Sequence, residues 1–78
     1  MAETLGDRIR MHRARLKLSQ TELGKRVGLS TNSVSAIEAG QDPKASRLKK
    51  IAKVLGVSTD YLLGMDESDS EFLPAAVA

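Results

Sequence analysis

The sequence predicts an all-α domain, and three observations lead to this prediction. Five successive segments carry apolar residues every three or four positions, the spacing of a helix with one buried face. Four of these segments open on Ser or Thr and most end at Gly, which are common helix-capping residues. No stretch alternates apolar and polar residues in the manner of a β-strand. With 78 residues, the chain is long enough for one compact five-helix bundle.

The first helix is expected over residues 4–18. Thr4 can cap its N-terminus, and the negative charge of Asp7 in the first turn suits the positive end of the helix dipole. The face that packs against the rest of the bundle is expected to carry Leu5, Ile9 and Leu16.

The second helix is expected over residues 19–28. Ser19 followed by Glu22 three positions later is a capping box, in which each residue's side chain bonds to the other's backbone N–H. Gly28 can end the helix because glycine adopts the left-handed conformation without strain.

Three more helices are expected over residues 30–40, 44–56 and 58–64. Ser30 and Ser58 can cap the first and the last of these. The helix between them has apolar residues at positions i, i+3, i+4 and i+7, the pattern of one buried stripe: Leu48, Ile51, Ala52 and Leu55.

The second and third segments together have the spacing of a helix-turn-helix, in which two helices cross at a wide angle through a tight turn. Gly24 is small where the two helices would meet, because a larger side chain would push them apart. Gly28 turns the chain between them. The apolar positions of this unit are Leu23, Val27, Leu29, Val34 and Ile37.

Composition narrows the possible functions. All 12 Lys and Arg residues lie between Arg8 and Lys53, whereas four of the 10 acids fall within residues 66–71. A basic body suggests a polyanionic partner, although basic residues that only keep the domain soluble would give the same count. The absence of Cys excludes disulfides and thiolate metal sites and favours the cytoplasm. No apolar run is long enough to cross a bilayer, and no cofactor or small-molecule site is evident.

Residues 4–64 resemble the phage-repressor helix-turn-helix family, the Cro-like or Xre-type regulators. The resemblance covers LGDRIRMHRARLKLSQTELGKRVGLS, SVSAIEAG and LKKIAKVLGVSTDYLLG, and it includes cap residues, glycines and core spacing together. It implies a five-helix bundle of the lambda-repressor-like type, in which the second and third helices bind DNA. It also implies a transcriptional repressor that binds a palindromic double-stranded operator as a homodimer. Because the domain is small, dimerisation is expected to stay weak until DNA holds the two subunits.

The resemblance places base-reading side chains on the outer face of the third helix. Val34 and Ile37 define the buried side of this helix, and the opposite side is small and uncharged. Such a face can enter the major groove, which is roughly 12 Å wide. The residues expected to contact bases are Thr31, Asn32, Ser35 and Ala36. The alternative is an ordinary solvated face, and this alternative is stronger for Ser35 alone than for the face as a whole.

Phosphate contacts are expected to flank the third helix. Gln20 opens the second helix, where free backbone N–H groups favour an anion. In the family, a Gln at this position binds a phosphate and can brace the recognition helix. The other expected phosphate contacts are Gln41, Lys44, Ser46 and Arg47 around the start of the fourth helix, with Arg10 as a weaker candidate.

Two more pairs of residues have expected roles, and the resemblance implies the first of them. Arg13 and Glu38 are expected to form a partly buried ion pair, and therefore to serve the structure and not DNA binding. Tyr61 and Leu62 are candidates for a dimer interface near the fifth helix. Packing in the core is the alternative role for both members of this second pair.

Other functions have less support. His12 is the only histidine and has no nucleophile–base arrangement around it, so neither an enzyme nor a metal site is expected. Alternatives within DNA binding are the amino-terminal domain of a longer phage repressor, an antitoxin or a restriction-system controller. A protein-interaction module that kept the fold and lost DNA binding is the alternative of a different class. Residues 1–65 are expected to form the domain, and residues 66–78 an acidic flexible tail or linker.

Overall fold

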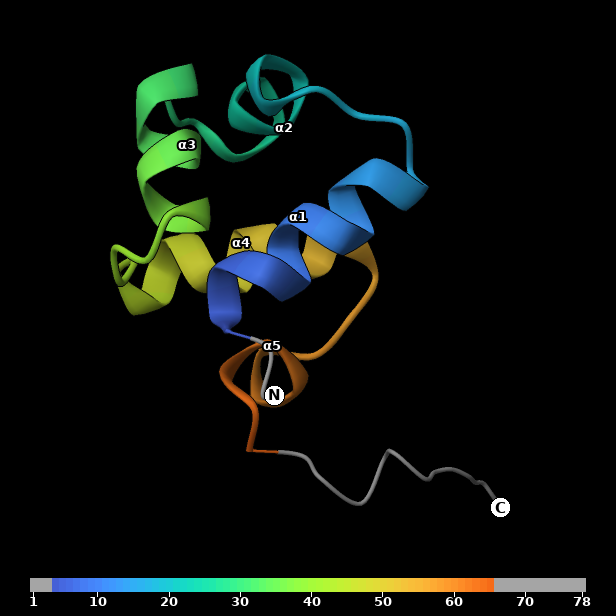
Figure 1. Cartoon of the computed structure of the whole chain (residues 1–78), viewed down its shortest axis with the longest axis vertical. Coiled ribbons are helices and arrows are strands. Elements are labelled where there is room, and N and C mark those ends of the chain that lie inside the picture. Colours follow the sequence, from blue (N-terminus) through green and yellow to red (C-terminus); the bar gives the residue numbers. More distant parts are fainter. Residues whose placement is uncertain (1–3, 66–78) are drawn as a thin grey trace.

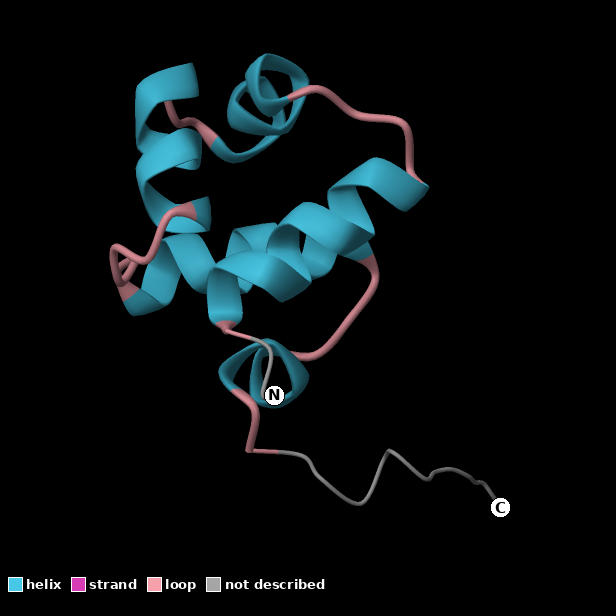
Figure 2. Ribbon diagram, in the orientation of Figure 1, coloured by secondary structure: helices cyan, strands magenta, loops and turns pink. Residues whose placement is uncertain are grey.

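The structure, a computed structural model, describes residues 4–65 and is built from five helices (Figures 1 and 2). In chain order they are α1 (Leu5–Arg15), α2 (Gln20–Val27), α3 (Thr31–Glu38), α4 (Ala45–Leu55) and α5 (Thr59–Leu63). No strand occurs within the described part of the chain, so the prediction of an all-α five-helix fold is confirmed. The segment expected to be an acidic tail, residues 66–78, lies outside the described residues. Between residues 4 and 65, no helix combines the length and the apolar character that crossing a membrane requires.

Side-chain caps begin four of the five helices in the described chain. The hydroxyls of Thr4, Ser19, Ser30 and Ser58 each accept a hydrogen bond from the backbone N–H three residues further on. At α1 and α2 the capping box is complete, because Asp7 and Glu22 accept in return from the backbone N–H of the cap residue. These caps confirm the helix starts predicted from the sequence. By contrast, α4 begins after Lys44 with no side-chain cap bond.

The end of α1 differs from the prediction. The helix stops at Arg15, and Lys17 takes the left-handed conformation with φ 58°. The chain therefore turns toward α2 before Leu16 can join the buried face, and Leu16 is 47% exposed. The expectation that Leu16 packs with Ile9 was wrong, because helical periodicity continued past the residue at which the helix ends.

The core is formed by ten buried apolar residues drawn from all five helices. They are Ile9, Leu23, Val27, Val34, Ile37, Leu48, Ile51, Ala52, Leu55 and Leu62. Leu62 is 0% exposed, which corrects its assignment to a dimer interface. A side chain with no accessible surface cannot contact a second subunit, so the alternative role, packing in the core, applies to Leu62.

Two glycines permit close approach of backbone segments. A Cβ atom on Gly24 would overlap the carbonyl oxygen of Leu29 in the turn before α3, which bears out the role predicted for this glycine. A Cβ atom on Gly6 would overlap the carbonyl oxygen of Glu38 at the end of α3. The second contact, between α1 and α3, was not predicted, because nothing local in the sequence marks it.

The contact at Gly6 predicts a reversal of the usual effect of glycine in a helix. Ala in place of Gly in a helix interior normally stabilises a protein by about 0.5–1 kcal/mol. Here we expect Gly6→Ala to lower the free energy of unfolding by about 1–3 kcal/mol, because the added methyl group must displace backbone. Urea denaturation measures the difference, with Lys49→Ala on the exposed side of α4 as a control. A stabilised Gly6→Ala protein would contradict the close approach of α1 and α3.

The capping boxes predict how stability depends on pH. Hydrogen bonds from the backbone N–H groups of Thr4 and Ser19 lower the pKa of Asp7 and Glu22, respectively. Because the pKa of each carboxyl is lower in the folded state than in the unfolded state, the ionised carboxylate stabilises the fold at pH values above the unfolded pKa. This stabilisation is lost as the pH falls through the folded pKa. The temperature at the midpoint of thermal unfolding should therefore decrease as the pH is lowered from about 5 to about 3.

Glu22→Gln gives a matched test, because Gln preserves the capping hydrogen bond but does not titrate. We expect the thermal midpoint of Glu22→Gln to be close to that of wild type at pH 3. Between about pH 5 and pH 3, the midpoint of Glu22→Gln should decrease less than that of wild type. Equal losses in the two proteins would exclude Glu22 as a source of the acid dependence.

Candidate nucleic-acid interface

The corner formed by α2 and α3 lies at one end of the molecule, with α5 toward the other end (Figure 1). Gly28 ends α2 in the left-handed conformation with φ 75°, and the N–H of Leu29 then donates to the carbonyl of Gly24 at 2.8 Å. The cap residue Ser30 follows at once, so only a short turn separates the two helices. This geometry is the helix-turn-helix that the spacing predicted.

The outer face of α3 is exposed, small and uncharged. Val34, Ile37 and Glu38 are the buried residues of this helix. The predicted base-reading residues lie elsewhere on its surface: Thr31, Asn32 and Ser35 are exposed, and Ala36 is half-buried. Within residues 4–65 the Asn32 amide makes no hydrogen bond. Its donor and its acceptor therefore remain available for a ligand.

One contact beside this face involves a residue that was not among the site residues predicted from the sequence. The hydroxyl oxygens of Thr21, on α2, and Thr31, on α3, lie 2.7 Å apart. Both residues are exposed. Thr21 carries no local sequence signal for this role, because its distance to Thr31 depends on the angle at which α2 and α3 cross.

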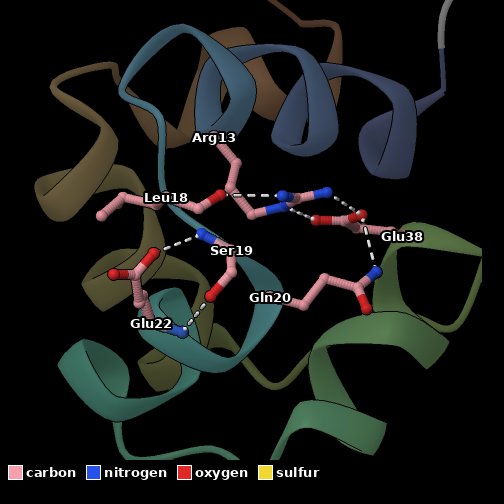
Figure 3. A network of polar contacts seen from close by, with 6 residues as sticks. All are labelled: Arg13, Leu18, Ser19, Gln20, Glu22 and Glu38. Atoms are coloured by element: carbon pink, nitrogen blue, oxygen red, sulfur yellow. Dashed lines mark hydrogen bonds and ion pairs between the residues drawn. The ribbon is translucent and has the colours of Figure 1, made fainter.

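Behind the face, a polar network joins three parts of the chain (Figure 3). The guanidinium of Arg13 donates to Glu38 through Nε at 2.7 Å and through Nη2 at 3.1 Å, and through Nη1 to the carbonyl of Leu18 at 2.8 Å. The amide of Gln20 also donates to Glu38, at 3.1 Å. The side chain of Glu38 is 4% exposed and that of Arg13 15%. The expected ion pair is thus present and largely buried, and its hydrogen bonds raise the pKa of Arg13.

The position of Gln20 bears on its expected phosphate contact. One amide N–H of Gln20 points inward to Glu38, so this residue braces the C-terminal end of α3. Its second amide N–H and its carbonyl oxygen are not used by that bond. A phosphate contact by Gln20 remains a prediction, and it would have to use the second amide N–H or the backbone N–H.

The other expected phosphate contacts surround the start of α4. Gln41, Lys44, Ser46 and Arg47 are all exposed. Because α4 has no side-chain cap, its first backbone N–H groups lack the partner that the other helices supply. A groove of about 180 Å³ lies here between α3 and the start of α4. It is lined by Ser33, Ile37, Gln41, Asp42, Pro43, Lys44 and Arg47.

Arg10 is placed less favourably for a phosphate. Its Nη2 lies 2.7 Å from Oδ1 of Asp7, one helical turn away on α1, and both side chains are exposed. A phosphate would have to compete with this carboxylate for the guanidinium. Arg10 therefore remains the weaker candidate among the predicted phosphate contacts.

Tyr61 links α5 to α1. Its hydroxyl lies 2.9 Å from Nε2 of His12, and the two rings meet edge to face with centroids 5.2 Å apart. The guanidinium carbon of Arg8 lies 5.5 Å from the centre of the Tyr61 ring. Tyr61 is half-buried, so part of its surface stays accessible, unlike that of Leu62.

The sequence model of the helix-turn-helix family matches residues 9–62, a range that contains the whole α2–α3 corner. The chain is similar to repressor protein C2 of Salmonella phage P22, with 39% identity over 69 residues, covering 87% of this chain and 32% of that protein. It is also similar to the HTH-type transcriptional regulator ImmR of Bacillus subtilis strain 168, with 35% identity over 65 residues, covering 82% and 51%. The chain thus spans only a third to a half of these relatives.

Solved structures show the same arrangement of helices. The P22 c2 repressor in complex with synthetic operator 9T in the presence of Tl⁺ superposes with a TM-score of 0.79 at 39% identity, covering 83% of this chain and 100% of that one. A chain of the SinR–SinI protein complex superposes with a TM-score of 0.73 at 28% identity, covering 88% and 68%.

The buried ion pair predicts an asymmetric response to substitution. Arg13→Met would leave the carboxylate of Glu38 buried without its main partner, and we expect a loss of about 3–5 kcal/mol in the free energy of unfolding. Replacing both residues, as Arg13→Met with Glu38→Leu, should restore most of that loss, because no charge then remains buried.

Chemical denaturation of the single and double variants measures this coupling. Arg10→Met is the matched control, since it breaks an exposed ion pair of the same helix and should change stability little. Losses that simply add in the double variant would mean that the two side chains do not depend on each other.

Proposed function

This chain belongs to the helix-turn-helix family, and we propose that it is a transcriptional repressor that binds double-stranded operator DNA sequence-specifically. In this proposal α3 enters the major groove, and the chain performs no catalysis. It acts in the cytoplasm, on the nucleoid. The main support is the α2–α3 corner, which presents a small, uncharged and exposed helix face at one end of the bundle (Figure 1). The P22 c2 repressor, a relative with a similar fold, has been solved with operator DNA.

The chemistry of the α3 face suits base edges. Asn32 can pair with N6 and N7 of adenine in a bidentate manner, and such a pair discriminates between bases by about 1–3 kcal/mol. The hydroxyls of Thr31 and Ser35 can donate or accept, and the methyl group of Ala36 can pack on a thymine methyl. Because these side chains are short, the backbone of α3 can approach the groove floor closely.

Phosphate binding would orient this face. Lys44 and Arg47 supply positive charge at the uncapped start of α4, and Gln41 and Ser46 can donate hydrogen bonds there. Asp42 lines the same groove and offsets part of that charge. With about 4–6 phosphates contacted per subunit, a dimer would bind with a log–log salt slope of about −7 to −11.

A homodimer on a palindromic operator completes the proposal. Two recognition helices would address half-sites about one helical turn, or roughly 34 Å, apart. Tyr61 is the remaining candidate for the dimer contact, since the residue is only partly buried. The symmetry and the half-site spacing of selected DNA sites report directly on this arrangement.

Two substitutions separate base readout from phosphate binding. Selection of bound duplexes from a random oligonucleotide pool gives the operator and its symmetry. Against that operator, Asn32→Ala should lower affinity about 5- to 150-fold for each half-site and relax the preference at one base position of each half-site. Lys44→Ala should weaken binding to every sequence alike and, because a dimer loses one phosphate contact per subunit, make the salt slope shallower by about two.

Outcomes contrary to the proposal are distinct. If both variants weakened binding to all sequences equally, the proposal that α3 contacts the bases would be wrong. A wild-type chain that retains no duplex in a salt-dependent way would instead support the protein-interaction module.

A further inference from the structure

We propose that Thr21 is a specificity-determining positioning residue, which holds the Thr31 hydroxyl in one orientation and thereby sets the base that Thr31 favours. The inference rests on the proposed function, because it concerns how α3 reads DNA. It assigns a role to an α2 residue that need not touch a base itself.

The geometry of the pair carries the inference. The two hydroxyl oxygens are 2.7 Å apart, which is the usual length of a well-formed O–H···O bond. Thr21 is the second residue of α2 and Thr31 the first residue of α3. Gln20, which precedes Thr21 on α2, bonds to Glu38 at the other end of α3. Two adjacent residues of α2 therefore hold both ends of the recognition helix.

The number of protons in the pair limits what Thr31 can offer to a base. A threonine hydroxyl has one proton and two acceptor lone pairs. If Thr31 donates to Thr21, it can only accept from a base, as from adenine N6 or cytosine N4. If it accepts from Thr21, it keeps its proton and one lone pair, and the bond restricts the directions in which these point. The pair therefore removes the donor role in the first case and limits the geometry of both roles in the second.

The bond also determines where the Thr31 methyl group lies. Threonine carries its hydroxyl and its methyl on the same Cβ atom, so fixing one fixes the other through χ1. A held Thr31 thus presents one defined pattern of hydroxyl and methyl to the groove. Without Thr21, the side chain can rotate and accept more than one base pair.

The effect should appear in the complex more than in the free protein. Both residues are exposed, so water can compete for their hydroxyls in the free chain. At a DNA interface that excludes water, the same bond gains strength and its loss has a cost. A residue of merely structural importance would instead change the stability of the free protein.

Thr21→Val keeps the shape of the side chain and removes the hydroxyl. In site selection from random duplexes, we expect this variant to lose about two- to tenfold in preference at a single base position. Preferences elsewhere in the site and the thermal midpoint should be unchanged. Thr21→Ser keeps the hydroxyl and should restore the preference.

A double-mutant cycle gives the sharper result. Thr31→Val should relax the same base position, and Thr21→Val combined with Thr31→Val should be no more relaxed than Thr31→Val alone. The inference is overturned if Thr21→Val leaves the base profile unaltered, if it weakens all sequences alike, or if the two effects add. A wild-type chain that enriches no sequence overturns the proposed function and this inference together, whereas the other outcomes overturn the inference alone.

Discussion

The ion pair between Arg13 and Glu38 is the constraint on which the arrangement of this small protein depends. A buried carboxylate is costly unless charged partners and hydrogen bonds surround it. Glu38 receives two bonds from Arg13 and one from Gln20, while Arg13 also bonds to the carbonyl of Leu18. These bonds tie α1, α3 and the start of α2 to one another. A placement that separated them would leave buried charges without partners, which is costly.

This constraint positions the outer face of α3. Gly6 lets α1 approach the end of α3, and Gly24 lets α2 approach the turn before it. Gln20 and Thr21 then hold the two ends of α3 from α2. A helix held at both ends presents its short side chains in fixed directions, which is what recognition of base edges requires. Lys44 and Arg47, two of the proposed phosphate contacts, lie at the start of α4.

Much of the fold was predictable because its signals are local. The capping boxes of Thr4 with Asp7 and of Ser19 with Glu22 lie within single turns, and the structure contains both. Gly24 was also predictable, because the spacing of a helix-turn-helix requires a small residue there. Leu16 and Leu62 were misplaced for the opposite reason. Helical periodicity could not show that α1 ends at Arg15, or that the bundle closes completely over the side chain of Leu62.

The sequence by itself determined the helices, their caps, the buried stripes and the face of α3 that stays free of core residues. These features follow from hydrogen bonds and periodicities that span a few residues. The tertiary structure decided which side chains from different helices meet: Thr21 with Thr31, Gly6 with Glu38, and Gln20 with the buried ion pair. Such meetings depend on the angle and distance at which helices cross. Packing of the whole core sets these quantities, and no local stretch of sequence encodes them.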